Sequence, residues 1–496
     1  MSNRNFYDLL LYFGIKTQLN ILLREMTIDS RKIIKGDLFI AIKGYSLDGR
    51  NYINQAIDNG ASAVIAESYS NLEKNKIYFN RGVPIIYINN LNDKLSSIAC
   101  RFYRNPSSKM KVVGITGTNG KTTITHLIAQ WVKKTGETSA VMGTIGNGIL
   151  GEISPSENTT SSAVDIQSKL SEFLKKNVSL TAIEISSHGL LQGRVSEFNF
   201  DAAVFTNLSR DHLDFHGSMK KYEAAKWLLF SDNKTKNQIL NADDQIGLKW
   251  LQKLPHACAV TIKNSIPNNW KGYWLKSTNL KYHNKGVTIT FDSSWGFGIL
   301  KSKFIGVFNV SNLLLAMATL LMLNYPLKQL IHFSDSLSPI CGRAETFQSF
   351  KKPLVIVDYA HTPDALKKIL LTARLHCKNK LWCIFGCGGD RDHGKRKLMG
   401  AIAEKLSDQV ILTNDNPREE DAFKIINDIM KGILNHNRVF VTIDRNKAVT
   451  KAILSASVED VVVIAGKGHE TYQNFGKYKI NYSDRLTVAK LLGVTI

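Results

Sequence analysis

Gly114-Ile-Thr-Gly-Thr-Asn-Gly-Lys-Thr-Thr123 is the glycine-rich stretch from which the organisation of this chain can be inferred. It follows the apolar, β-branched pair Val112-Val113, which predicts the end of a buried strand. It precedes residues 125–133, where apolar side chains recur at helical spacing. In such a strand–turn–helix unit, backbone N–H groups of the turn and of the helix N-terminus can surround a polyphosphate. The stretch therefore predicts a phosphate-binding loop.

The side chains of this loop support the same prediction. Lys121 adds a positive charge that can reach terminal phosphates, and a hydroxyl of Thr122 or Thr123 can ligate Mg²⁺. The spacing departs from the general GxxxxGK[ST] pattern, because position 115 is Ile and the glycines are residues 114, 117 and 120. A purely structural turn is the alternative, but turn chemistry alone does not explain Gly-Lys-Thr-Thr at a strand-to-helix junction.

Length and composition are typical of a multidomain globular protein. A chain of 496 residues with 44% hydrophobic and 21% charged residues predicts about three domains. The longest apolar run, Leu313–Leu323, is too short to span a bilayer, and Met1–Asn5 lacks the pattern of a signal peptide. Six cysteines are scattered without a CxxC pair, which favours reduced thiols over a disulfide framework. We therefore expect a cytoplasmic protein with no membrane span.

The net charge of +22 raises the question of a nucleic-acid partner. Lysines and arginines are spread along the whole chain, however, without a basic tail or a patch interleaved with aromatic residues. A diffuse positive field also suits an anionic small-molecule substrate. We expect small-molecule substrates and no nucleic acid; a nucleotide-regulated nucleic-acid-binding protein is the alternative that the charge suggests.

Alternating strand and helix patterns divide the chain into three predicted domains, residues 1–108, 109–338 and 339–496. The predicted fold class is α/β, with a central P-loop domain built on a parallel sheet. A small N-terminal α/β domain and a C-terminal Rossmann-like α/β domain flank it. Residues 255–305 contain short alternating runs that predict an antiparallel excursion, and Asn105–Lys109 is predicted to be a linker.

Polar residues follow the predicted strands, where an open α/β sheet places its ligands. Glu184 lies in an apolar frame, so it is predicted to be a Mg²⁺ ligand or, alternatively, part of a structural salt bridge. His212 lies in a polar cluster after the next strand, although Mg²⁺ prefers oxygen donors. Lys226 lies on a predicted helix over residues 222–230, and the pattern alone predicts a surface position for it.

Eight motifs, in order along essentially the whole chain, resemble the Mur ligase family of peptidoglycan synthesis. They are Gly117–Thr123, Glu184–Gly189, Asn207–Asp214, Tyr222–Lys226, Phe308–Asn312, Gly342-Arg343, Asp358–Pro363 and Gly466–Glu470. The segment Asp415-Asn-Pro-Arg418 is similar to the family's recognition motif for meso-diaminopimelate. Relatives that add L-lysine are expected to lack that arginine.

The resemblance implies an ATP-dependent ligase with a central ATPase domain, which requires Mg²⁺ and uses ATP as co-substrate. The γ-phosphoryl group of ATP passes to the D-Glu carboxylate of UDP-N-acetylmuramoyl-L-alanyl-D-glutamate. An amine of meso-2,6-diaminopimelate then attacks the acyl phosphate. The alternatives are a related ligase that adds L-lysine and a ligase similar to folylpolyglutamate synthetase. We also expect a monomer, although the sequence itself does not reveal the oligomeric state.

The resemblance assigns roles to residues of the middle domain. The implied catalytic residues are Lys121, Glu184, His212 and Lys226. The implied metal ligands are Thr122, Glu184, His212 and Lys226, the last as an N6-carboxylysine formed with CO₂. The implied ATP-binding residues are Gly117, Thr118, Asn119, Gly120, Lys121, Thr122, Thr123, Asn309, Arg343, Asp358 and His361. Carbamylation needs an unprotonated amine, which a low-dielectric site favours.

It also assigns the two other substrates. The UDP-muramoyl-dipeptide is implied to contact Ile28, Ser30, Tyr45, Ser46, Leu47, Asn158, Thr159, Thr160, Ser186, Gln192 and Arg194. Helix capping is the alternative role for the two threonines. The implied diaminopimelate residues are Arg391, Asp415, Asn416, Pro417, Arg418, Gly466 and Glu470. A planar guanidinium binds a carboxylate in a bidentate geometry that lysine cannot match.

Overall fold

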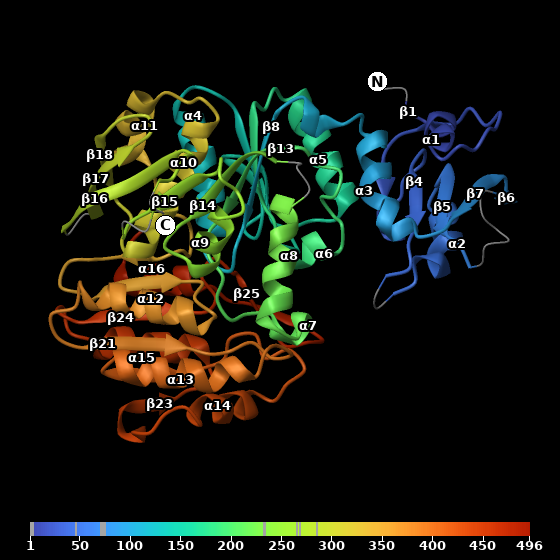
Figure 1. Cartoon of the computed structure of the whole chain (residues 1–496). Helices are drawn as coiled ribbons and strands as arrows, with labels where there is room; N and C mark the ends of the chain where they lie inside the picture. Colours follow the sequence, from blue (N-terminus) through green and yellow to red (C-terminus); the bar gives the residue numbers. More distant parts are fainter. Residues whose placement is uncertain are drawn as a thin grey trace. The chain divides into compact units, whose positions relative to one another are not determined.

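The structure is a computed structural model that describes residues 4–44, 47–69, 76–231, 235–263, 266, 269–283 and 286–496 (Figure 1). The chain forms two compact units. The first comprises Met1–Gly114, Gly136–Ala203 and Leu228–Lys236, and the second comprises Ile115–Thr135, Val204–Trp227 and Asn237–Ile496. The predicted domain boundaries near residues 108 and 338 stay a prediction.

A mostly parallel sheet with the order β3-β4-β5-β7-β6 forms the N-terminal part of the first unit. Alternate residues of β4 enter different cores, because successive side chains of a strand point to opposite faces. Leu38 and Ile40 pack with α1 and α3, while Phe39 and Ala41 pack with α2. The elements are β1 Arg4–Asn5, α1 Phe6–Tyr12, β2 Leu22–Leu23, β3 Met26–Thr27, η1 Ser30–Lys32, β4 Leu38–Ala41, η2 Gly49–Tyr52, α2 Ile53–Asp58, β5 Ala63–Glu67, β6 Ile77–Asn80, β7 Val83–Ile88 and α3 Leu91–Phe102.

The predicted linker is a packed segment. Residues Pro106–Ser108 form the short 3₁₀ helix η4, in which Pro106 and Ser107 are buried. The proline occupies the first position of this helix, where its missing N–H costs nothing.

The middle of the chain contributes the strand order β11-β10-β9-β12-β8-β13-β14-β15-β16-β17-β18. Pairing is parallel for β9 with β12 and along β14-β15-β16, and antiparallel along β16-β17-β18. The predicted antiparallel excursion is therefore confirmed. The strands are β8 Lys111–Thr116, β9 Ser139–Met142, β10 Asn147–Ile149, β11 Glu152–Ser154, β12 Leu180–Glu184, β13 Phe200–Phe205, β14 Thr235–Asn241, β15 Cys258–Thr261, β16 Trp274–His283, β17 Gly286–Ser293 and β18 Gly298–Ser302.

The helices of this part agree with the predicted pattern, with earlier starts in two cases. Helical spacing predicts helices over residues 125–133, 163–175 and 310–323; the second is α5 Ala163–Lys175, whereas the other two begin earlier, α4 at Lys121 and α10 at Val307. The helices are α4 Lys121–Lys134, α5 Ala163–Lys175, α6 Ser187–Leu191, α7 Leu213–His216, α8 Met219–Ser231, α9 Gln245–Leu251, α10 Val307–Met322, α11 Leu327–Phe333 and η5 Ser334–Ser336. Among the described residues, no helix is long and apolar enough to cross a bilayer.

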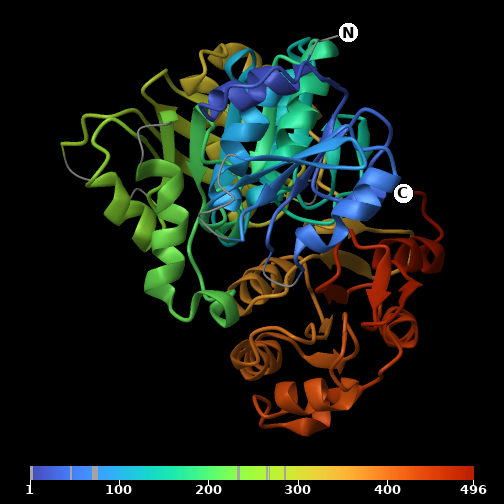
Figure 2. The ribbon, with the colours of Figure 1, turned by 90° about the vertical axis from the view of Figure 1, so that its right-hand side faces the viewer.

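The C-terminal sheet has the order β19-β20-β24-β21-β22-β23 and is parallel except for β19. Helices cover both faces, as Figures 1 and 2 show: α12, α13 and α14 pack on one, and α15 and α16 on the other. Burial on both faces explains the continuous apolar runs of these strands. The elements are β19 Glu345–Phe347, β20 Leu354–Asp358, α12 Pro363–Arg374, β21 Leu381–Phe385, α13 Gly394–Leu406, β22 Gln409–Leu412, α14 Ala422–Met430, η6 His436–Arg438, β23 Val439–Val441, α15 Arg445–Ser455, β24 Val461–Ala465, β25 Tyr472–Asn474, β26 Lys479–Asn481 and α16 Asp484–Leu492.

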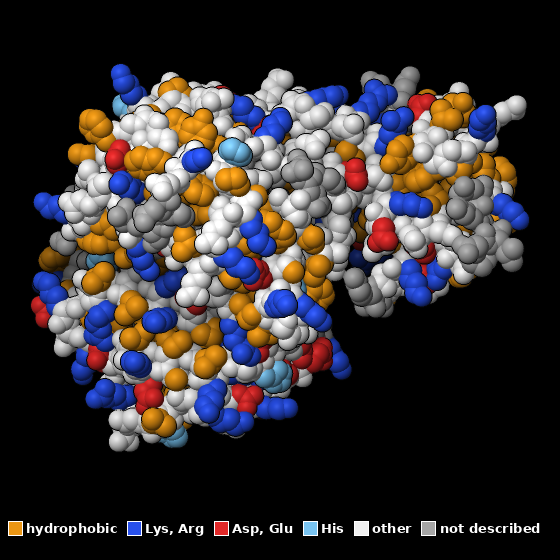
Figure 3. All heavy atoms as spheres, viewed as in Figure 1, with side chains coloured by type: hydrophobic (Ala, Val, Ile, Leu, Met, Phe, Trp, Pro, Cys, Tyr) orange, Lys and Arg blue, Asp and Glu red, His pale blue; other side chains and the backbone are white. Residues whose placement is uncertain are grey.

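The surface does not concentrate its positive charge on the face that Figure 3 shows. Lysine and arginine side chains lie scattered there among acidic and apolar ones. All six cysteines lie in the described part of the chain and are free.

Candidate active site

The predicted phosphate-binding loop joins β8 to α4 in the second unit. Gly117 and Gly120 have φ of +145° and +92°, which side chains other than glycine rarely adopt. A Cβ atom on Gly117 would lie 1.9 Å from Thr206 Oγ1, and one on Gly120 would lie 2.5 Å from Asn312 Oδ1. Both glycines are therefore required by close packing as well as by backbone conformation.

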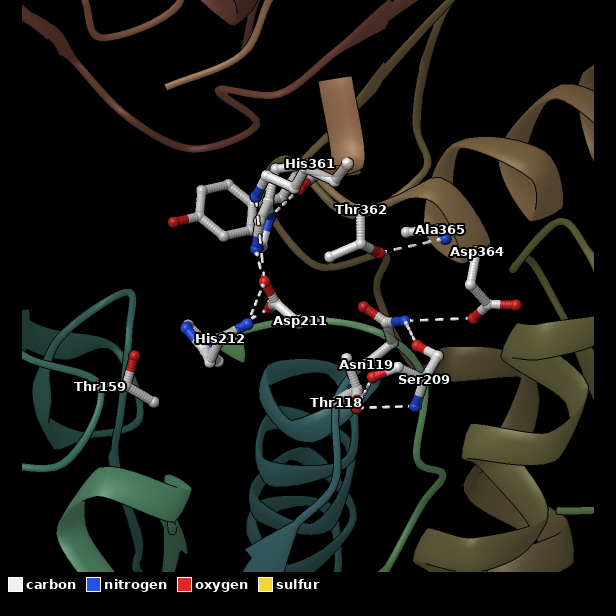
Figure 4. Close-up of polar contacts among 12 residues, drawn as sticks. Thr118, Asn119, Thr159, Ser209, Asp211, His212, His361, Thr362, Asp364 and Ala365 are labelled. Atoms are coloured by element: carbon white, nitrogen blue, oxygen red, sulfur yellow. Dashed lines mark hydrogen bonds and ion pairs between the residues drawn. The ribbon is translucent and has the colours of Figure 1, made fainter. Parts of the chain in front are cut away.

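Residues that follow β13 hold this loop in place. The N–H of Thr118 donates to the Asn207 carbonyl at 2.9 Å, and the N–H of Asn119 donates to Asn207 Oδ1 at 3.0 Å. Thr118 Oγ1 in turn accepts from the Ser209 N–H at 3.0 Å, a contact drawn in Figure 4. The Asn119 side chain reaches Asp364 Oδ2 at 3.2 Å, which ties the loop to the start of α12.

Two lysines converge on one carbonyl of the loop. Lys121 Nζ donates to the carbonyl oxygens of Gly117 and Thr118 at 2.9 and 3.0 Å, and Lys226 Nζ donates to Gly117 at 2.9 Å. Lys226 is only 1% exposed and lies 4.6 Å from the centre of the Tyr222 ring, so the predicted surface position was wrong. The helix pattern missed this because α8 contains apolar residues around most of its circumference. Burial, with the charge of Lys121, lowers the pKa of Lys226 well below its ordinary value.

Asp211 is a site residue that sequence reasoning did not single out, although it lies inside a quoted motif. This buried carboxylate faces His212 Nε2 at 3.3 Å and His361 Nε2 at 3.7 Å, as Figure 4 shows. Lys395 Nζ lies 3.8 Å from its other oxygen. Burial alone would raise the pKa of Asp211, but the neighbouring charges of His361, His212 and Lys395 outweigh burial and hold it well below its ordinary value. The cluster thus brings two predicted nucleotide-site histidines together around one anion.

Arg343 connects the loop to the C-terminal sheet. Its Nη2 donates to Thr122 Oγ1 at 2.9 Å, and its guanidinium lies 4.3 Å from the centre of the Tyr359 ring. Asp358 Oδ2 accepts from the backbone N–H of Ala344 at 2.6 Å, and burial raises the pKa of Asp358. The predicted ATP-site residues Arg343 and Asp358 therefore belong to one packed group with the phosphate-binding loop.

The remaining predicted ATP-site residues occupy the same unit. Asn309 accepts from Asn312 Nδ2 at 3.3 Å and donates to the Ile305 carbonyl at 2.9 Å. Asn312 ends the motif Phe308–Asn312 but was not predicted to bind ATP, and its side chain lies against Gly120. Thr123 is buried in the first turn of α4.

In the first unit, Glu184 is buried and surrounded by hydroxyl groups. Its carboxylate accepts from the N–H and hydroxyl of Thr144 at 2.9 and 3.1 Å. Thr144 also contacts Thr159 at 3.1 Å, while Thr160 Oγ1 donates to the Glu184 carbonyl at 2.8 Å and contacts Ser186 at 3.1 Å. Ser162 caps α5, so the capping role considered for the threonines belongs to a neighbouring residue.

Arg194 completes this hydroxyl-rich group. Its Nη1 donates to the Thr160 carbonyl and its Nε donates to Gln192 Oε1 at 2.9 Å. Burial lowers the pKa of Arg194. Asn158 is exposed at the edge of the group. Five predicted dipeptide residues from separate segments of sequence are thus in contact: Thr159, Thr160, Ser186, Gln192 and Arg194.

The predicted UDP residues near the N-terminus are less informative. Ile28 packs against the core, and the Ser30 hydroxyl donates to Gln55 at 2.7 Å. Leu47 is exposed. The predictions for Tyr45 and Ser46 lie outside the described residues.

Arg418 occupies the predicted amino-acid site at the carboxyl edge of the C-terminal sheet. It has a φ of +53° and is half-buried, and its Nη1 donates to the Gly389 carbonyl at 2.6 Å. A Cβ atom on Gly388 would lie 2.9 Å from Arg418 Nη1 and 3.8 Å from Arg391 Cγ. Burial, with the charge of Arg391, lowers the pKa of Arg418. Two guanidinium groups therefore share a glycine-lined corner suited to an anion.

The acidic side of this site is formed by two loops. Gly466 has a φ of +114°, and a Cβ there would lie 2.3 Å from Asp415 Oδ2, so only glycine allows the loops to meet. Asn416 Nδ2 donates to Glu470 Oε2 at 2.9 Å. Lys467, which was not predicted as a site residue, donates to the same oxygen at 2.7 Å. Pro417 lies beside Gly389, where a Cβ would contact the Pro417 carbonyl at 1.8 Å.

No group of three or more His, Cys, Asp or Glu side chains that could hold a metal ion occurs among the described residues. The implied ligands instead include a carboxylate, a hydroxyl and a buried lysine whose lowered pKa favours the amine that carbamylation requires. Carboxylate, hydroxyl and carbamate oxygens are the donors that Mg²⁺ prefers. These three side chains therefore fit magnesium, whereas the fourth implied ligand, His212, offers a nitrogen donor that Mg²⁺ favours less.

Comparison with known proteins gives matches along most of the chain. Residues 115–320 match the Mur ligase middle domain, residues 342–468 the Mur ligase glutamate ligase domain, and residues 23–103 the Mur ligase family catalytic domain. A solved UDP-N-acetylmuramoyl-L-alanyl-D-glutamate–2,6-diaminopimelate ligase is 33% identical, with 98% of each chain covered and a TM-score of 0.67. MurF from Acinetobacter baumannii is 15% identical, with 98% of each chain covered and a TM-score of 0.67. The folylpolyglutamate synthase of Mycobacterium tuberculosis complexed with ADP and AMPPCP is 16% identical, covering 75% of this chain and 92% of that one, with a TM-score of 0.59.

Proposed function

Because this chain belongs to the Mur ligase family of ATP-dependent amide-bond-forming ligases, we propose that it joins meso-2,6-diaminopimelate to UDP-N-acetylmuramoyl-L-alanyl-D-glutamate. The reaction uses ATP and Mg²⁺ and releases ADP and phosphate. The product is a cytoplasmic precursor of peptidoglycan, and the enzyme works as a monomer.

The observation that carries this proposal is the pair of guanidinium groups in the C-terminal site. Arg418, at the end of Asp415-Asn-Pro-Arg418, is half-buried beside Arg391 and a glycine-rich turn. A half-buried guanidinium needs an anionic partner, and a planar fork binds carboxylate in a bidentate geometry. The distal carboxylate of diaminopimelate supplies that partner.

The same corner discriminates against L-lysine. The side chain of lysine has no distal carboxylate, so its binding would leave Arg418 desolvated and unpaired. Sites built to pair with a polar substrate group reject analogues that lack it, because the protein group then loses its partner. Asp415 and Glu470 supply the opposite charge for the ammonium groups of the substrate.

Phosphoryl transfer brings a carboxylate and a triphosphate together, so cations must offset their repulsion. The phosphate-binding loop presents backbone N–H groups and Lys121, and Arg343 lies beside Thr122. His212 and His361 are oriented by Asp211. These groups hold ATP so that the carboxylate attacks its γ-phosphorus, and the amine then displaces phosphate from the acyl phosphate.

Thr122, Glu184, His212 and Lys226, the last as its carbamate, are the residues that would hold Mg²⁺. When bound, the ion neutralises charge on the phosphate oxygens. The hydroxyl-rich group of Thr159, Thr160, Ser186, Gln192 and Arg194, with Asn158, binds the muramoyl-dipeptide. The Arg194 guanidinium, which also contacts Thr160 and Gln192, would pair with a carboxylate of the dipeptide.

Phosphate release by the purified protein tests this proposal. Reactions contain ATP, Mg²⁺ and UDP-muramoyl-dipeptide, with either meso-diaminopimelate or L-lysine as the amine. We expect release with diaminopimelate and little with lysine. The opposite preference would assign the chain to lysine addition, and release with a folate and glutamate instead would assign it to folylpolyglutamate synthesis.

A further inference from the structure

Lys467 is a cation fully enclosed in the C-terminal site. It follows Gly466 at the end of β24, and its side chain has no exposed surface. Long charged side chains are almost never fully buried unless they are paired. The reason for its burial should therefore be found in the groups that it contacts.

The hydrogen bonds of Lys467 are with two residues of the predicted amino-acid site. Lys467 Nζ lies 2.7 Å from Glu470 Oε2 and 3.2 Å from Asn416 Oδ1, and it lies 5.7 Å from the centre of the Tyr472 ring. Asn416 Oδ1 also accepts from the backbone N–H of Asn474 at 2.8 Å. Because two donors face Oδ1, the Asn416 amide must turn Nδ2 toward Glu470, which it does at 2.9 Å.

This arrangement fixes the role of each oxygen of Glu470. Oε2 accepts from both Lys467 and Asn416, whereas no described residue donates to Oε1. The Glu470 side chain is 14% exposed, so a substrate group can reach it. A carboxylate held in this way presents one fixed oxygen to an ammonium group.

We propose that Lys467 is a positioning residue for the amino-acid substrate, which holds Glu470 and Asn416 so that Glu470 Oε1 receives an ammonium group of diaminopimelate. The proposal rests on the proposed function and extends it to a residue outside the recognition motif. Lys467 also balances the negative charge of Glu470. The charge of Arg391 and Arg418 is thereby left for substrate carboxylates.

The test measures the three substrates separately in Lys467→Met. We expect the KM for diaminopimelate to rise on the order of 100-fold, because one partner of a buried, hydrogen-bonded charge pair is removed. The KM values for ATP and for UDP-muramoyl-dipeptide should stay within about twofold, since Lys467 contacts Glu470, Asn416 and Tyr472. Acyl-phosphate formation without the amine, trapped by hydroxylamine as the hydroxamate, should persist.

The double variant Lys467→Met/Glu470→Gln shows whether Lys467 acts through Glu470. We expect it to bind diaminopimelate no more weakly than Glu470→Gln alone. Additive losses, or equal rises in all three KM values, would overturn the proposal and leave Lys467 with a general structural role. Lys479→Met is the matched control, because Lys479 lies 4.4 Å from the centre of the same Tyr472 ring but is exposed.

Lys467→Gln serves if the methionine variant does not fold, because it keeps a hydrogen-bond donor in the enclosed position. The same contrast between diaminopimelate and the other two substrates is then expected, with a smaller rise of about tenfold. An unchanged KM for diaminopimelate in a folded variant would overturn the role proposed for Lys467, but it would not contradict the proposed function. If the wild-type protein does not use diaminopimelate, the proposed function itself is wrong.

Discussion

Replacing Arg418 by alanine should damage the use of diaminopimelate and leave the other two substrates unaffected. The guanidinium is half-buried, donates to the Gly389 carbonyl at 2.6 Å and lies close to Arg391. Removing one partner of a desolvated charge pair costs about 3 kcal/mol, within a usual range of roughly 2–5 kcal/mol. Because about 1.4 kcal/mol corresponds to tenfold, kcat/KM for diaminopimelate should fall about 100-fold.

The assay follows phosphate release at saturating ATP and UDP-muramoyl-dipeptide while the amine is varied. Arg418→Lys should recover part of the loss, since it restores the charge but not the bidentate geometry. The ratio of kcat/KM for diaminopimelate over L-lysine should narrow in Arg418→Ala, because lysine no longer leaves an arginine unpaired. Arg438→Ala, an exposed change in the same domain, is the control. Full activity with diaminopimelate in a folded Arg418→Ala protein would refute the reasoning.

Three further predictions concern the second unit. Lys121→Ala should lower turnover by at least about 1,000-fold, because the loop would lose the cation that can reach the terminal phosphates; near-normal turnover would contradict the role of the loop. Wild-type protein in ¹³C-bicarbonate should show a carbamate NMR signal that Lys226→Ala lacks, because burial lowers the pKa of Lys226; an identical signal in both proteins would place the modification elsewhere. His126 is buried in α4, and burial, with the charge of Arg343, lowers its pKa from 6.5 to about 4. This difference makes protonation of His126 less favourable in the folded state than in the unfolded state by about 3 kcal/mol. The unfolded state then binds more protons between these values, so the free energy of unfolding should fall as pH falls from 6.5 to 4, and His126→Gln should flatten this dependence in urea titrations.

Elements with a strong pattern could be predicted from the sequence because local patterning and tertiary packing agree in them. The spacing of apolar residues over 163–175 predicts a helix, and the β-branched run 461–465 predicts a strand. Both elements have these bounds in the structure, as α5 Ala163–Lys175 and β24 Val461–Ala465. The start of α4 could not be found in this way, because Lys121–Thr123 carry polar side chains that obscure the helical period. Packing against other segments buries these hydroxyls, and no local pattern reports such packing.

Site residues that depend on partners distant in sequence were the ones missed. Arg445 is fully buried and pairs with Asp484, and it donates to the carbonyls of Asn414 and Ala465, which precede the two loops of the amino-acid site. Lys467 and Asp211 likewise find their partners on other segments. A buried charge looks like a surface charge in sequence until its partner is known, so the fold must be in hand before such residues can be assigned.

The two lysines at the phosphate-binding loop, Lys121 and Lys226, explain why carbamylation of Lys226 is compatible with the fold. Lys121 and Lys226 both donate to the Gly117 carbonyl, and the charge of Lys121 contributes to the lowered pKa of Lys226. Two ammonium groups at one oxygen repel each other, and burial of Lys226 adds to the cost. Carbamylation would replace the neutral amine by an anion, which the charge of Lys121 attracts. A carbamate at this position also supplies oxygen donors, which the unmodified lysine cannot. Burial therefore favours the neutral amine that carbamylation requires, and the charge of Lys121 would stabilise the resulting carbamate.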